Sequence, residues 1–318
     1  MTVERLARIV FVAANPSIDR LLEVEALEPG AIHRPGRVVA VPGGKGLNAA
    51  RAAATLGGSV VAVAMLGGHA GAWIAERLAD LGLATRTIDV DGETRTCVSV
   101  LDRSTGHLTE FYEPGLPVSA AAVARLEAVV AEELAGERVG ALALSGSLPS
   151  GAPRDGYARL VTAASERRVI AIVDSHGDAL EAALAARPTV VKVNAAEAAE
   201  VTKTIVDGPK SAAAAADRLR DAGAGSVVVT LGREGAVACD ERGRWHLSAS
   251  NDARQYPVGS GDAFLGGLAV ALVVGASLTD AARMGMAAGI ANAAVAGAGN
   301  LDPAEVERLR PVIAIAPL

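Results

Sequence analysis

Short apolar runs alternate with longer alanine-rich stretches along most of this chain. An apolar run bounded by turn residues predicts a buried strand, and a longer stretch with helical spacing predicts a helix. We expect strands at residues 10–14, 60–65, 141–144, 169–173, 189–193 and 226–230. We expect helices at residues 46–56, 73–81, 120–134, 154–167, 179–186 and 211–222, and one that begins near Gly261. This alternation predicts an α/β fold with a parallel sheet and helices on both faces.

Two segments, at about residues 17–41 and 94–113, break this rhythm. They carry scattered charges and turn residues, and the second alternates enough to form a hairpin around Ser104-Thr105-Gly106. We expect these segments to form a small separate β-layer, a lid over one edge of the larger domain.

The composition narrows the class of protein. Of the 318 residues, 51% are apolar and only 3% aromatic, so Ala, Val, Leu and Ile must build the core of one large domain or two smaller ones. The net charge is −6 without a Lys/Arg cluster, which argues against nucleic acid as a partner. Cys97 and Cys239 lack metal-ligand spacing, residues 268–275 are too few to span a membrane, and residues 1–8 hold no apolar core of a secretion signal. We therefore expect a cytoplasmic protein.

The most informative stretch is Tyr256–Phe264, which places a carboxylate just inside a glycine-rich helix start. The first backbone N–H groups of a helix have no partner within it and suit an anion. The small residues Gly259, Ser260 and Gly261 let a phosphate approach these amides. Asp262 beside them could take a proton from a hydroxyl, as phosphoryl transfer to an alcohol requires. For this segment alone, a simple helix cap is the favoured interpretation.

The loop Pro42–Asn48 leads from an extended segment into a helix. Its glycines, among them Gly43 and Gly44, permit close approach of a ligand to the backbone. Lys45 adds a cation, and Asn48 adds a hydrogen-bond donor and acceptor. The spacing is not that of a Walker A loop. A plain turn with a solvated lysine is an equally good interpretation.

Polar residues end several of the predicted strands. Such ends carry Asn15, Asp174, Asn194, Thr230 and Ser145–Ser147. Because ligands of open parallel sheets bind outside the carboxyl ends of the strands, this convergence predicts a binding site there.

Two of these strand ends have more than one interpretation. Asn194 and Glu197 form a capping-box pair if a helix begins there, and local spacing favours this over a role of Glu197 in ordering Mg²⁺ through water. The loop Thr230–Ala236 either holds nucleotide phosphates or forms a plain hairpin turn.

Together and in order, these segments resemble the ribokinase-like (PfkB) carbohydrate kinase family over nearly the whole chain. Pro42–Asn48 and Gly259–Asp262 resemble its two signatures, and Asn194–Glu197 resembles its Asn-x-x-Glu motif. The resemblance implies a single ribokinase-like three-layer αβα domain over residues 1–318, with a mostly parallel central sheet and a small β-sheet lid. The sequence is most similar to the branch that acts on already phosphorylated sugars, which includes 1-phosphofructokinases and tagatose-6-phosphate kinases.

The resemblance also implies roles for individual residues. Asp262 would be the base, beside an anion hole formed by the amides of Gly259, Ser260 and Gly261. The substrate's hydroxyls and phosphate would be held by Asp19, Gly43, Gly44, Asn48, Ser147, Lys45, Arg34 and Arg95. ATP and Mg²⁺ would lie along Lys192, Asn194, Glu197, Thr230, Gly232 and Gly235, with Glu197 reaching the metal through water and Asn292 near adenine.

The implied activity is ATP-dependent phosphorylation of D-fructose 1-phosphate to fructose 1,6-bisphosphate. If Lys45, Arg34 and Arg95 converge, the substrate must be anionic, because unpaired like charges repel. The alternatives are tagatose-6-phosphate kinase or 6-phosphofructokinase activity, another sugar kinase of the family, or a regulator that binds sugar phosphates or nucleotides without turnover. The oligomeric state stays open, and a homodimer that pairs through the lid is one alternative.

Overall fold

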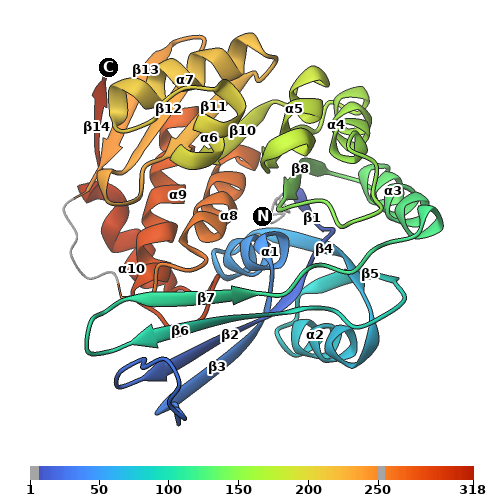
Figure 1. Cartoon of the computed structure of the whole chain (residues 1–318). Helices are drawn as coiled ribbons and strands as arrows, with labels where there is room; N and C mark the ends of the chain where they lie inside the picture. Colours follow the sequence, from blue (N-terminus) through green and yellow to red (C-terminus); the bar gives the residue numbers. More distant parts are fainter. Residues whose placement is uncertain (1–6, 250–254) are drawn as a thin grey trace, which may run out of the picture.

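The computed structural model describes residues 7–249 and 255–318, and its strands form two separate sheets (Figure 1). The large sheet has ten strands in the spatial order β14 (Ala314–Pro317), β13 (Gly243–Ser248), β12 (Ala236–Asp240), β11 (Ser226–Thr230), β10 (Val190–Asn194), β9 (Ile170–Asp174), β8 (Val139–Ser145), β1 (Arg8–Ala13), β4 (Ser59–Leu66) and β5 (Ala84–Asp89). Neighbouring strands from β5 to β11 are parallel, and β12, β13 and β14 continue the sheet antiparallel. The predicted mostly parallel sheet is confirmed. Residues 1–6, on which the expectation of no secretion signal partly rests, lie outside the described residues.

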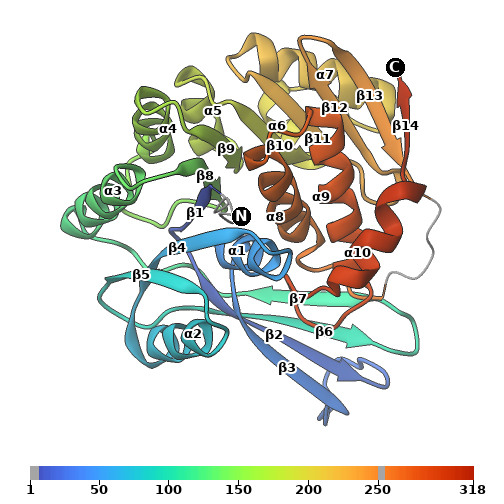
Figure 2. The same cartoon turned by 180° about the vertical axis from the view of Figure 1, so that it is seen from behind.

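Helices cover both faces of the large sheet, as Figures 1 and 2 show. Side chains alternate along each strand, so Phe11 and Val10 of β1 belong to core clusters on opposite faces. The face of Phe11 is covered by α1 (Lys45–Thr55), α2 (Gly68–Asp80), α8 (Ser260–Val273), α9 (Leu278–Ala293) and α10 (Pro303–Leu309). The face of Val10 is covered by α3 (Ala120–Leu134), α4 (Gly156–Glu166), α5 (Gly177–Ala185), α6 (Ala195–Thr202) and α7 (Pro209–Asp221). The expected three-layer αβα arrangement is therefore present, and the described residues also include the short 3₁₀ turns η1 (Gly232–Glu234) and η2 (Arg310–Val312).

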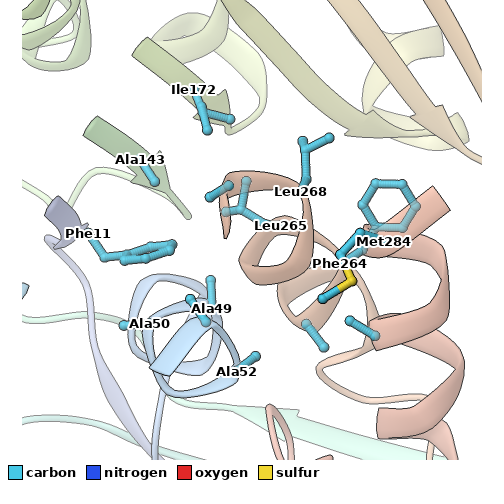
Figure 3. Close-up of a cluster of buried hydrophobic side chains, with 14 of the residues drawn as sticks. Phe11, Ala49, Ala50, Ala52, Ala143, Ile172, Phe264, Leu265, Leu268 and Met284 are labelled. Carbon is cyan, nitrogen blue, oxygen red and sulfur yellow. The ribbon is translucent and has the colours of Figure 1, made fainter. Parts of the chain in front are cut away.

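Small residues let the helices on the face of Phe11 approach one another closely (Figure 3). A Cβ atom at Gly266 of α8 would lie 2.7 Å from the carbonyl oxygen of Ala49 in α1, so only glycine fits there. A Cβ atom at Gly46 would likewise lie 2.6 Å from the carbonyl oxygen of Val12. These contacts bring α8 against α1 and place the start of α1 at the carboxyl end of β1.

The second sheet, called the lid below, lies against one side of this body (Figure 1). Its strands follow the order β3 (Arg37–Gly43), β2 (Ser17–Val24), β6 (Thr96–Asp102) and β7 (Leu108–Tyr112). β2 pairs in parallel with β6, whereas β3 and β7 pair antiparallel with their neighbours. The lid therefore joins two segments that lie far apart in the sequence, and the expected small sheet is present.

No helix in the described part of the chain combines the length and the hydropathy that crossing a bilayer requires. The longest helix there is α9, with 16 residues, and it packs against α8, α10 and β12.

Candidate active site

A cavity of about 840 Å³ lies between the lid and the carboxyl ends of the strands of the large sheet. Its lining runs from the lid, past the starts of α1 and α8, to β10 and β11. Most of the predicted site residues line it: Asp19, Gly44, Lys45, Asn48, Arg95, Ser147, Lys192, Asn194, Thr230, Gly232, Gly235, Gly259, Ser260, Gly261 and Asp262. The strand ends and the two glycine-rich loops therefore meet at one cavity, as expected from the parallel topology.

Asp262 lies in the first turn of α8 and lines this cavity. The helix begins after Gly259, whose φ is 81° and whose Cβ atom, if present, would lie 2.6 Å from backbone atoms of Ala298 and Gly299. Only 8% of Asp262 is exposed. Burial raises the pKa of Asp262 to about 6, against the lowering effect of the nearby Lys45 ammonium. The carboxylate is thus ionised at neutral pH and basic enough to accept a proton.

Asn48 connects Asp262 to Asp19 of the lid. Its side-chain Nδ2 donates to Oδ2 of Asp262 at 3.0 Å and to Oδ2 of Asp19 at 2.9 Å. Oδ2 of Asp19 also accepts from the backbone amide of Gly44 at 3.2 Å. Gly43 was predicted to touch the sugar, but it is not part of the cavity lining; a Cβ atom there would lie 2.1 Å from Cγ of Asp19. Gly43 instead makes room for the Asp19 carboxylate, which shares one donor with Asp262.

A second cluster joins two lysines through one carboxylate. Asp174 is fully buried and accepts from Nζ of Lys45 at 3.1 Å and from Nζ of Lys192 at 2.6 Å. Burial acts to raise the pKa of Asp174, but the ammonium groups of Lys192 and Lys45 outweigh it and hold the pKa below its usual value. Nζ of Lys45 also donates to Oε1 of Glu197 at 2.7 Å. Two carboxylates, from β9 and α6, therefore bind the ammonium of Lys45, which lines the cavity, and its contact with a substrate phosphate stays a prediction.

The expected convergence of three cations is also absent from the described structure. Arg95 lines the cavity, and its guanidinium donates to the backbone carbonyls of Asn15, Glu113 and Pro16 at 3.1, 3.3 and 3.4 Å. No carboxylate among the described residues forms an ion pair with it. Arg34 is exposed in the loop between β2 and β3 and is not part of the lining. The case for an anionic ligand therefore rests on Arg95.

Glu197 takes part in the capping box that the sequence favours. Oδ1 of Asn194 accepts from the amide of Glu197, and Oε2 of Glu197 accepts from the amide of Asn194, both at 2.9 Å. Residues 7–249 and 255–318 contain no cluster of three or more side chains that could hold a metal ion. Mg²⁺ in nucleotide sites keeps several waters and needs only one or two protein carboxylates besides phosphates. Glu197 is not part of the cavity lining, and its two carboxylate oxygens accept from Lys45 and Asn194, so it could reach such an ion only through water.

The predicted nucleotide end of the site is only partly as expected. Thr230 and Gly235 line the cavity, and the chain between them turns from β11 into the antiparallel β12. Asn292 does not line the cavity. It is fully buried, and its Nδ2 donates to the carbonyl oxygens of Asn300 at 2.8 Å and Gly297 at 3.3 Å. Its predicted place near adenine is therefore corrected to a role within the fold.

Two buried charged residues at the site carry no predicted role. The sequence predicts Asp174 only as a polar residue at a strand end. Its strand, β9, lies beside β10, which carries Lys192, and this neighbourhood could have indicated the ion pair between them. Arg51 follows Asn48 by three positions, a spacing that puts both side chains on one helix face. A single arginine on an otherwise alanine-rich, buried helix face could have indicated that Arg51 has a specific role.

Comparisons with known proteins extend over almost the whole chain. The family described as pfkB family carbohydrate kinase matches residues 8–305. The chain is 34% identical over 284 residues to the 1-phosphofructokinase of Rhodobacter capsulatus, a match that covers 88% of each chain. It is 33% identical over 288 residues to the ATP-dependent 6-phosphofructokinase isozyme 2 of Escherichia coli (strain K12), covering 90% of this chain and 92% of the relative.

The fold is also found among solved structures. The phosphofructokinase-2 from Escherichia coli in complex with fructose-6-phosphate matches with a TM-score of 0.86 and 30% sequence identity, covering 96% of this chain and 99% of that chain. The family resemblance and the fold that the motifs indicate are confirmed.

Proposed function

The chain belongs to the pfkB family of carbohydrate kinases, and from this premise we propose that it transfers a phosphoryl group from ATP to D-fructose 1-phosphate, forming fructose 1,6-bisphosphate. It is a phosphotransferase whose acceptor is a hydroxyl group. The observation that carries the choice of a phosphorylated sugar is Arg95, which lines the cavity with only backbone carbonyls as hydrogen-bond partners among the described residues. A guanidinium binds phosphate through a planar fork of donors, so a substrate phosphate would supply its missing counter-charge.

In the proposed reaction, Asp262 takes the proton of the acceptor hydroxyl. The hydroxyl oxygen bonds to the γ-phosphorus of ATP, and the bond from that phosphorus to the oxygen of the leaving ADP breaks. Asp19 and Asn48 would hold the sugar hydroxyls so that the acceptor lies beside Asp262. The amides at the start of α8 would offset the charge on the transferred group, together with Lys192, whose Nζ lies 3.4 Å from where a Cβ atom of Gly261 would be. Closure of the lid would exclude water as a competing acceptor.

Mg²⁺ would be held by Glu197 through water and by the phosphates of ATP. When bound, it neutralises part of the charge on those phosphates. Displacement of Lys45 from Glu197 is not required for this, because Mg²⁺ that retains its water shell contacts the carboxylate indirectly.

A panel of acceptors tests the proposed substrate. We expect kcat/KM for D-fructose 1-phosphate to exceed that for neutral D-fructose by at least about tenfold, since a charge-assisted hydrogen bond contributes about 1.5–3 kcal/mol. ADP release would be measured for both sugars and for fructose 6-phosphate and tagatose 6-phosphate. The variant Arg95→Met should lower the rate with phosphosugars and leave the rate with fructose nearly unchanged. A preference for fructose 6-phosphate or tagatose 6-phosphate would replace the proposed substrate, and a preference for fructose would remove the phosphosugar class.

We also propose that the lid pairs with the lid of a second copy of this chain. The register of the sheet puts Tyr112 on the cavity side and its neighbour Phe111 on the outer side, where Val38 of β3 also lies. Phe111 is 59% exposed and Val38 is 50% exposed. A sheet with an uncovered apolar face gains stability when a partner buries that face.

Charge on the outer face of the lid should therefore prevent association. We expect the wild-type chain to sediment as a dimer at micromolar concentration and Phe111→Glu to sediment as a monomer. Arg125→Glu, a change at an exposed position of α3, is the control and should leave the dimer intact. A wild-type monomer at the same concentration would contradict the proposal.

A further inference from the structure

A buried arginine lies behind the two carboxylates of the site. Only 6% of Arg51 is exposed, and no carboxylate among the described residues is in ion-pair contact with it. Its Nη2 donates to Oδ1 of Asn48 at 3.1 Å and to the carbonyl oxygen of Ala298, and its Nη1 donates to Oδ1 of Asn300 at 2.8 Å. Burial lowers the pKa of Arg51 to about 10. Since a buried cation with neutral partners is costly and an apolar side chain could fill the same space, stability alone does not explain Arg51.

The contact with Asn48 determines which way its side-chain amide faces. The guanidinium offers only donors, so the group of Asn48 that faces it must be the oxygen. The NH₂ group is then turned toward Asp19 and Asp262, where it donates to both carboxylates. The flipped amide would set its oxygen against two carboxylates and its NH₂ group against the guanidinium. Arg51 thus selects the one orientation of the Asn48 amide in which its NH₂ group donates to both carboxylates.

The same guanidinium holds the turn at residues 298–300 against α1. A Cβ atom at Gly299 would lie 2.9 Å from Nη2 of Arg51, so the guanidinium packs directly on this backbone. This turn also packs against Gly259, the N-cap residue of α8. A Cβ atom at Gly259 would lie 2.6 Å from Cα of Ala298. One side chain therefore contacts both the bridge between the acids and the backbone that supports the amides of the anion site.

We propose that Arg51 is a positioning residue for phosphoryl transfer. It fixes the Asn48 amide between Asp19 and Asp262 and anchors the turn that supports the start of α8. It does not touch the substrate and acts through these two contacts. The proposal rests on the proposed role of Asp262 as the base.

Loss of Arg51 affects the ionisation of Asp262 in a defined direction. The cation and the hydrogen bond from Asn48 both favour the ionised form, so Arg51→Met raises the pKa of Asp262 by both effects. The other charged groups that face Asp262 remain in the variant: Lys45 on α1, Asp174 on β9, Lys192 on β10 and Asp19 on β2. Because the base must be ionised to act, activity should be lost at a higher pH than in the wild-type chain.

The test is the pH dependence of kcat/KM for the folded Arg51→Met variant, with the same phosphosugar used throughout. The ratio of wild-type to variant kcat/KM should rise by about tenfold between pH 8 and pH 6, and KM for the sugar should rise more than KM for ATP. Titration of the substrate phosphate cancels in this ratio. Arg283→Met on α9, outside the cavity lining, is the control and should match the wild-type chain at every pH. An equal loss at all pH values with both KM values unchanged would assign Arg51 a merely structural role and overturn the proposal.

A second variant keeps the test decisive if Arg51→Met does not fold. Arg51→Lys retains the charge, but its compact ammonium lacks the planar fork whose two separate nitrogens reach Asn48, Ala298 and Asn300. We expect a raised KM for the sugar with a smaller pH effect than in Arg51→Met. Wild-type values for Arg51→Lys would overturn the proposal. If Asp262→Asn is inactive at the same time, the base assignment survives and only the role of Arg51 fails.

Discussion

Asp262→Asn is expected to lower kcat by about 10²–10⁴-fold and to leave ATP binding nearly unchanged, because general base catalysis commonly supplies a factor of this size. Asparagine has nearly the same shape and keeps a partner for Asn48, but it cannot accept the proton of the acceptor hydroxyl. Steady-state kinetics with the preferred phosphosugar and calorimetric titration with ATP would measure the two quantities.

A matched control separates base catalysis from the electrostatics of a helix start. Asp280 lies in the first turn of α9, as Asp262 does in α8, but Asp280 is exposed and outside the cavity lining. Asp280→Asn should therefore keep the wild-type kcat. An Asp262→Asn variant with wild-type kcat would refute Asp262 as the base.

Asp174→Ala is expected to lower the free energy of unfolding by about 3–5 kcal/mol, the usual result of removing one partner from a buried ion pair. The substitution leaves the ammonium groups of Lys45 and Lys192 close together, with no carboxylate between them. Urea denaturation followed by circular dichroism would measure the change.

The control for this prediction is an aspartate in an exposed ion pair. Asp178 of α5 pairs with Arg154 at 3.0 Å, and both side chains are more than half exposed. Asp178→Ala should change the free energy of unfolding by less than about 1 kcal/mol. Equal losses in Asp174→Ala and Asp178→Ala would show that the buried cluster does not have the proposed energetic role.

The core strands of the large sheet could be predicted because burial on both faces leaves continuous apolar runs, as in β10 and β11. The strand β5 (Ala84–Asp89) carries polar residues at an edge and gave no such run. The antiparallel strands β12, β13 and β14 were missed for a related reason. No α-helix separates β11, β12 and β13, and β14 has only four residues, so the alternation of strands and helices does not mark them. Of these three missed strands, only β12 is largely buried.

The positions of the cations depend on contacts between distant segments, and the sequence could not supply these. Lys45 is separated by 129 residues from Asp174 and by 152 residues from Glu197. No residue close to Lys45 in the sequence therefore indicates that these two carboxylates bind its ammonium. Asp262 could be placed from local sequence, since a glycine-rich helix start fixes its orientation within a few residues. Local sequence therefore placed Asp262 in the first turn of a helix, whereas its charged surroundings required the fold.

The most direct test of the central claim compares the wild-type chain with Asp262→Asn across pH 5 to 8. Burial raises the pKa of Asp262 to about 6, so the ionised base is present above that pH and is lost below it. Titration of the substrates is common to both proteins and cancels in the ratio of their kcat/KM values. We predict a ratio that is constant above about pH 7 and falls about tenfold per pH unit below pH 6. A ratio that does not change with pH would contradict the assignment of Asp262 as the group that accepts the proton.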